Sequence, residues 1–119
     1  MKYIFFNSRD QLIRLEKDKI VYFQAEGNYT RLVMVNRQST VVTHSLKNVE
    51  EALASQLGEQ AEIYLRVGRK FMVNRMFIYQ VNIARKTLVL SDFEHFSYQL
   101  PVSEKALKEI RHYVLDLKE

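Results

Sequence analysis

Short strand-like segments follow one another along most of this sequence, and they constrain its fold class more firmly than any other feature. Residues 20–25 and 29–35 are rich in β-branched and aromatic side chains, and Gly27 and Asn28 between them predict a hairpin turn. Residues 39–43 then complete a three-stranded meander. Similar segments occupy residues 63–67, 71–73, 77–82, 87–91 and 96–100. Because these strands do not alternate with helices, the sequence predicts a mainly β fold of antiparallel sheets.

Between the predicted strands, one segment has apolar residues at the spacing of a helix. Leu46, Val49, Leu53 and Leu57 recur at spacings typical of a buried helix face. Ser45 is a suitable N-cap, and the glycine at position 58 can end the helix. The sequence therefore predicts a helix at about residues 46–57.

The second helical stripe closes the chain. After Pro101, Ser103 can cap a helix at about residues 103–117. Its apolar stripe consists of Leu107, Ile110, Val114 and Leu117. We expect this stripe to pack on a sheet, with a dimer contact as the alternative.

The stretch YLRVGRKFMVN, residues 64–74, alternates like a buried strand but carries two cations at its centre. A continuous strand would place Arg69 on the apolar face, and burying an unpaired guanidinium costs several kcal/mol. Gly68 offers a solution, because glycine readily adopts the backbone conformations of a turn or bulge. We expect the chain to leave the sheet at Gly68, expose Arg69 and Lys70, and return at Phe71.

Composition limits the class of protein. The 119 residues are 47% hydrophobic, which is enough for one domain over residues 1–119. The absence of cysteine excludes a disulfide framework, a thiolate zinc site and a cysteine nucleophile, and it fits a reducing compartment. No apolar run approaches the roughly 18 residues of a membrane span, so we expect a cytoplasmic protein without a membrane partner.

Charge is segregated along the chain. Residues 27–49 and 63–91 together contain nine basic residues and no acidic residue, whereas the other segments contain nine basic and all fourteen acidic residues. If the fold brings the two basic windows together, they form a positive face suited to a polyanion. The alternative is chance clustering on a solvated surface.

No pattern indicates catalysis. His44, His95 and His112 are scattered without metal-ligand spacing, and motifs for phosphate cradles or serine nucleophiles are absent. Glu50 and Glu51 are expected to be solvated on a helix face. The sequence therefore predicts a protein that is not an enzyme and needs no cofactor or metal.

Four stretches together resemble the LytTR family of bacterial DNA-binding domains. They are IVYFQAEGNYTRL (20–32), HSLKNVEEAL (44–53), YLRVGRKFMVNRMFI (64–78) and LPVSEKALKEI (100–110). Their order and spacing match the family from about residue 12 to residue 113. The resemblance implies an elongated arrangement of small antiparallel sheets, and binding of double-stranded promoter DNA as an output domain of response regulators. It also implies that loops read successive major grooves, and it leaves open a second copy bound on repeated half-sites.

The resemblance also implies three contact regions. The first comprises Asn28, Tyr29, Thr30 and Arg31, with Thr30 and Arg31 foremost. The second comprises Arg69 and Lys70. The third comprises Ser103 and Lys105, where Glu104 replaces an arginine common in relatives and leaves open whether this contact exists.

Five further residues of the matched stretches are expected to hold phosphate or to have a structural role. His44 can approach a phosphate or serve the start of the helix, and Lys47 can hold a phosphate. Arg66 can hold a phosphate or join an intramolecular ion pair, and the same pairing is possible for Arg75. Asn74 is expected to bond to backbone. The competing functional class is a small β-rich module that binds a protein or a ligand with a basic face.

Overall fold

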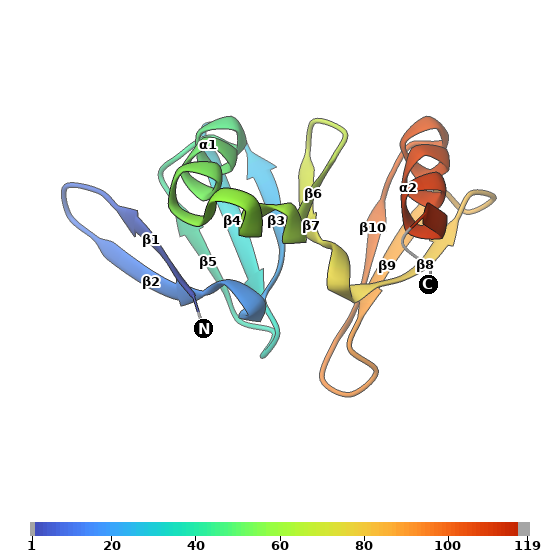
Figure 1. Cartoon of the computed structure of the whole chain (residues 1–119), viewed down its shortest axis with the longest axis horizontal. Helices are drawn as coiled ribbons and strands as arrows, with labels where there is room; N and C mark the ends of the chain where they lie inside the picture. The colour runs from blue at the N-terminus through green and yellow to red at the C-terminus, as the bar shows by residue number, and fades with distance from the viewer. Residues whose placement is uncertain (1, 117–119) are drawn as a thin grey trace. The chain divides into compact units, whose positions relative to one another are not determined.

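The computed structural model describes residues 2–116 and contains three antiparallel sheets and two α-helices (Figure 1). The mainly β fold class with one internal and one C-terminal helix is confirmed. The chain divides into two compact units, the first ending at Arg75 and the second beginning at Met76.

A five-stranded antiparallel sheet forms the centre of the first unit, with the order β5-β4-β3-β7-β6. The predicted meander is present as β3 (Ile20–Glu26), β4 (Tyr29–Met34) and β5 (Ser39–Val42). The hairpin of β6 (Tyr64–Val67) and β7 (Phe71–Asn74) is added beside β3. This pairing joins residues 47 to 51 positions apart, so local sequence patterns do not reveal it.

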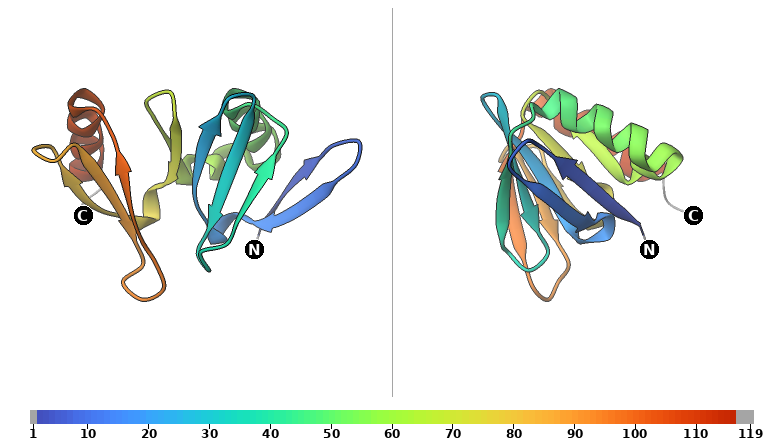
Figure 2. Two further views of the ribbon diagram at one scale, coloured as in Figure 1. Left: turned by 180° about the vertical axis from the view of Figure 1, so that it is seen from behind. Right: turned by 90° about the vertical axis from the view of Figure 1, so that its left-hand side faces the viewer.

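Helix α1 (Leu46–Leu57) covers one face of this sheet (Figure 2). Its bounds are the predicted ones. The predicted N-cap is also present, because the Ser45 hydroxyl accepts a hydrogen bond from the Asn48 amide at 3.2 Å. Gly58 ends the helix with a φ of +58° and donates its amide to the Ala54 carbonyl. The four residues of the predicted stripe are buried in one core with Phe23 and Leu32. Short 3-10 turns occupy Lys17–Lys19, Gly58–Ile63 and Arg75–Phe77.

A two-stranded hairpin of β1 (Tyr3–Asn7) and β2 (Leu12–Glu16) extends the same core. Ile4 and Phe6 are buried there, whereas Phe5 faces outward and is 45% exposed. The backbone amide and carbonyl of Phe5 bond to the side-chain amide of Gln56 on α1, each at 2.8 Å. The sequence pattern does not indicate β2, because its charged residues conceal a short, half-exposed strand.

The second unit is a three-stranded sheet with the order β10-β9-β8 and the helix α2 (Glu104–Asp116). Its strands are β8 (Ile78–Asn82), β9 (Thr87–Ser91) and β10 (Ser97–Pro101). The Ser103 hydroxyl accepts a hydrogen bond from the Ala106 amide at 3.2 Å, as a cap does. Leu107 and Ile110 are buried, and α2 packs on β8; the predicted position of Leu117 lies outside the described residues.

The chain does leave the sheet at Gly68. Residues 68–70 form the turn between β6 and β7, Gly68 has a φ of +62°, and both cations are exposed. Val67 pairs with Phe71 across the hairpin, so the apolar alternation continues on both sides of the turn. The positive φ at Gly68 forms the turn between the two apolar strands, and Arg69 and Lys70 are exposed to solvent because they lie in this turn.

We predict that Gly68→Ala lowers the free energy of unfolding by about 1 kcal/mol, because a Cβ disfavours a positive φ. Beyond the adjacent residues of the chain, no atom lies within 4 Å of the added Cβ, so the loss is conformational and not a clash. Chemical denaturation measures it, with Lys70→Ala as the matched control on the same turn. Equal midpoints for the Gly68 variant and the native chain would contradict this account.

Candidate nucleic-acid interface

Three connections of the first unit lie at the same end of the five-stranded sheet (Figure 1). They are the β3–β4 turn at 27–28, the link from β5 to α1 at 43–45, and the β6–β7 turn at 68–70. The strand register requires this arrangement, because Glu26 pairs with Tyr29, Gln24 with Phe71 and Thr30 with Val42. We call this end, residues 26–31, 43–48 and 66–70, the basic end.

Two hydrogen bonds tie the three connections together. The Ala25 amide donates to the Lys70 carbonyl at 2.8 Å, which holds the β6–β7 turn beside the β3–β4 turn. The Thr30 hydroxyl donates to the His44 carbonyl at 2.7 Å, which holds the link to α1 beside β4. Hydrogen bonds therefore connect all three segments of the basic end, although these segments are far apart in the sequence.

The basic end carries five basic residues and one acidic residue. Lys47, Arg69 and Lys70 are exposed, and no carboxylate of residues 2–116 lies within ion-pair distance of them. Asn28 is also exposed, and Tyr29 is 51% exposed. These side chains are available to a polyanion without first breaking an internal ion pair.

Arg31 differs from these cations, because internal partners hold its guanidinium. Its Nε and Nη2 atoms donate to the two carboxylate oxygens of Glu26 at 2.7 and 3.2 Å, and its Nη1 donates to the Ser39 hydroxyl at 3.1 Å. These hydrogen bonds lower the pKa of Glu26 and raise the pKa of Arg31, so both groups are charged at neutral pH. Arg31 is therefore partly exposed at the surface, but its charge is paired with that of Glu26.

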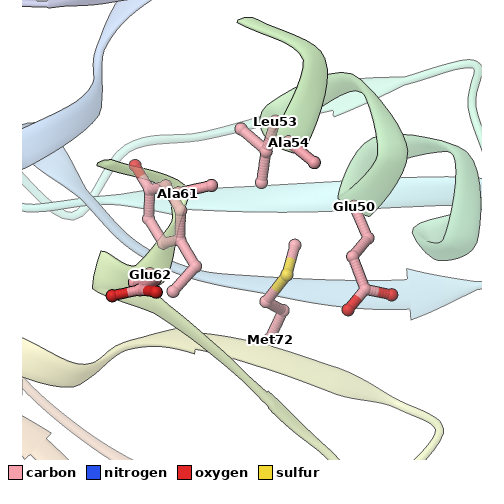
Figure 3. Close-up of a pocket in the computed structure, with 7 residues that line it drawn as sticks. Glu50, Leu53, Ala54, Ala61, Glu62 and Met72 are labelled. Carbon is pink, nitrogen blue, oxygen red and sulfur yellow. The ribbon is translucent and has the colours of Figure 1, made fainter. Parts of the chain in front are cut away.

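Arg66 forms the intramolecular ion pair that the sequence analysis allowed. Its Nη1 lies 3.0 Å from Oε1 of Glu50 on α1. Its Nε and Nη2 donate to the carbonyls of Gly68 and Arg69 at 3.1 and 3.2 Å. Figure 3 shows the Glu50 carboxylate beside Met72 at a shallow pocket of 260 Å³ between α1 and β7.

Thr30 lies in the interior of the first unit. Its relative exposure is 0%, and its hydroxyl is used by the His44 carbonyl. Thr30 therefore does not contribute to the exposed surface of the basic end, and its contact with DNA stays a prediction. It supports the basic end from inside.

His44 and Asn74 have structural contacts. The His44 ring is half-buried, with its centroid 6.3 Å from that of Phe6, and its carbonyl fixes Thr30. Asn74 is 1% exposed, and its side-chain amide donates to the Ile20 carbonyl at 3.0 Å, which confirms the expected backbone bond.

Ser103 and Lys105 belong to the second unit and are both exposed. The Ser103 hydroxyl is already bonded to the Ala106 amide, while Glu104 pairs with Lys108 at 3.9 Å. The structure therefore separates the predicted residues into a first set gathered at the basic end and a second set on the start of α2.

Two acidic residues that pair with arginines of the basic end, Glu26 and Glu50, were not predicted from the sequence to belong to the site. Glu26 meets Arg31 diagonally across a two-residue hairpin, a cross-strand relation that the predicted register could have shown. Glu50 meets Arg66 through the packing of α1 on the sheet, for which no local signal exists. Both acids hold arginines and leave the other cations of the basic end unpaired among the described residues.

Comparison with known proteins decides the family. The family model described as the LytTr DNA-binding domain matches residues 10–114, nearly the whole chain. The chain belongs to the LytTR DNA-binding domain family. This non-catalytic family is typical of response-regulator transcription factors, so the predictions of a DNA-binding domain without enzyme activity are confirmed.

A solved structure has the same fold. It is the LytTr DNA-binding domain of a Bacillus cereus protein described as a methyl-accepting/DNA response regulator. The TM-score is 0.65 at 21% identity, and the similarity covers 96% of this chain and 97% of that one. The search of curated proteins returns no match. Within residues 2–116, no helix of this LytTR domain has the length and apolar character that a membrane crossing requires.

We predict that Thr30→Val destabilises the LytTR domain by about 1 to 2 kcal/mol, because it leaves the partly buried His44 carbonyl without its donor. Thr30→Ser keeps the hydroxyl and should lose less. Urea denaturation of both variants measures the difference. Valine and serine variants of equal stability would show that the Thr30 to His44 bond does not hold the link to α1.

Proposed function

We propose that this LytTR domain binds double-stranded promoter DNA sequence-specifically and regulates transcription, with its loops in successive major grooves. The observation that carries the proposal is the convergence of three connections at the basic end, where Lys47, Arg69 and Lys70 are exposed and unpaired among the described residues. No recognition helix is required, because the β6–β7 turn itself projects two cations. A cytoplasmic location remains a prediction.

The exposed residues divide into two roles. Arg69 lies at the centre of its turn, and its planar guanidinium can pair with O6 and N7 of guanine, a contact worth about 1 to 3 kcal/mol in discrimination. Asn28 can bond to base edges from the neighbouring turn, and Tyr29 offers an apolar ring. Lys47 and Lys70 are suited to phosphates, which set affinity without reading sequence.

The second unit supplies the third proposed contact. Ser103 and Lys105 lie where α2 begins, a position at which backbone amides favour an anion. We propose that residues 1–119 work as one DNA-binding domain, that Lys105 contacts a phosphate, and that a second copy occupies repeated half-sites. The exposed carboxylate of Glu104 weakens this contact relative to the basic end.

Selection of bound duplexes from a random pool tests the proposed function and shows half-site spacing directly. We predict that the LytTR domain enriches a defined sequence. Affinity for random duplex should also fall with salt at a log–log slope of about −3, because the three proposed phosphate contacts, Lys47, Lys70 and Lys105, each displace about 0.9 counterion. No binding near about 50 mM salt, where phosphate contacts are strong, would favour a module that binds an acidic protein or ligand.

We predict that Arg69→Ala and Lys47→Ala act differently on the selected duplex. The Arg69 variant should lose about tenfold or more in discrimination, the scale of one base contact. The Lys47 variant should weaken binding to selected and random duplexes alike and reduce the salt slope by about 0.9. Titration of both duplexes separates the two roles, with Lys19→Ala at the other end of β3 as the charge control. Identical effects of the two variants on both duplexes would refute the division.

A further inference from the structure

We propose that Arg66 is a positioning residue that fixes the β6–β7 turn for sequence reading, and that it does not act as a phosphate ligand. This inference rests on the proposed function. All three guanidinium nitrogens of Arg66 have internal partners: the Gly68 carbonyl, the Arg69 carbonyl and the Glu50 carboxylate. These bonds take three of the five guanidinium N–H groups and orient the group toward the turn and α1.

The carbonyls of the turn show the effect of this arrangement. The turn has three residues, and each of their carbonyls has a donor from the first unit. Arg66 serves Gly68 and Arg69, and the Ala25 amide serves Lys70 at 2.8 Å. An exposed turn would ordinarily direct such carbonyls to water. Here the backbone on both sides of the Arg69 side chain is held before any ligand arrives.

Glu50 anchors this arrangement to the helix. The Arg66 side chain lies on the α1 face of the sheet and pairs at 3.0 Å with Glu50. Glu50 stands one turn beyond Lys47 on the same helix. The ion pair therefore fixes the β6–β7 turn relative to the start of α1, so that Arg69 and Lys47 keep one spacing. Arg31 also forms an ion pair, but it does not hold a turn as Arg66 does. Its partners are the side chains of Glu26 and Ser39 and not the carbonyls of a turn.

A rigid turn affects discrimination more than affinity. A phosphate contact tolerates movement, because it is a charge interaction with a repeating backbone. A bidentate base contact requires defined distances and angles, and ordering a loose turn on binding would weaken it. Loss of the Arg66 contacts should therefore lower the preference for the selected sequence and leave binding to random duplex nearly unchanged.

Arg66→Lys is the deciding variant, because it keeps the charge and removes the planar fork that serves two carbonyls. Arg66→Met removes both, and Lys19→Met is the control for a lost charge away from the basic end. The ratio of affinities for selected and random duplexes is measured for each. We expect both Arg66 variants to lower this ratio about tenfold, the scale of one base contact, and Lys19→Met to leave it unchanged.

A phosphate ligand predicts the opposite pattern. Arg66→Lys would then keep the native ratio and salt slope, and Arg66→Met would weaken both duplexes equally and reduce the slope by about 0.9. Either result would overturn the positioning role. Glu50→Gln supplies an independent test: positioning predicts a lower ratio, whereas release of a phosphate ligand predicts tighter binding to both duplexes by one factor.

Amide hydrogen exchange without DNA tests the structural step itself. The Ala25 amide reports on the turn, because its acceptor is the Lys70 carbonyl. We expect faster exchange at Ala25 in both Arg66 variants, with the Leu32 amide of the buried β4 as an unchanged reference. Unchanged exchange at Ala25 would show that Arg66 does not hold the turn.

The affinity measurements distinguish failure of the proposed function from failure of the positioning role. If the native chain has no sequence preference, the proposed function fails. If it has a preference that Arg66→Lys retains, only the positioning role fails.

Discussion

The antiparallel pairing of β3 with β7 is the interaction on which the candidate interface depends. It places Phe71 opposite Gln24, so the turn before β7 lies next to the turn after β3. A shift of the register by one residue would move every side chain of β7 to the other face and take Met72 out of the core. The buried pattern of β7 thus determines where Arg69 and Lys70 stand.

The packing of the first unit determines which cations of the basic end form ion pairs with acidic residues. Arg31 and Arg66 lie within reach of Glu26 and Glu50, and both ion pairs are half-exposed, so their main effect is on side-chain position and not on stability. The remaining cations stand on turns and at the helix start, where no acid of the described chain reaches them. The same end of the sheet therefore carries two ion-paired arginines, Arg31 and Arg66, beside cations that have no ion-pair partner among the described residues.

Local chemistry explains how much could be predicted from the sequence. Both helices, the meander and the turn at Gly68 follow from period, caps and backbone preference, and the structure confirms them. The burial of Thr30 and the pairing of Arg66 with Glu50 arise from packing between segments far apart in sequence, which no local pattern encodes. The family resemblance rests on order and spacing, which do not show which side chains of the matched stretches turn inward, as that of Thr30 does.

The side-chain amide of Gln56 gives the hairpin of β1 and β2 an unusual neighbour. By bonding to both backbone groups of Phe5, it takes the place that a further strand would occupy. An open strand edge is a template for intermolecular sheet growth and fibre formation. Because the Gln56 amide already occupies the amide and the carbonyl of Phe5, this edge has fewer free backbone groups with which another chain could pair.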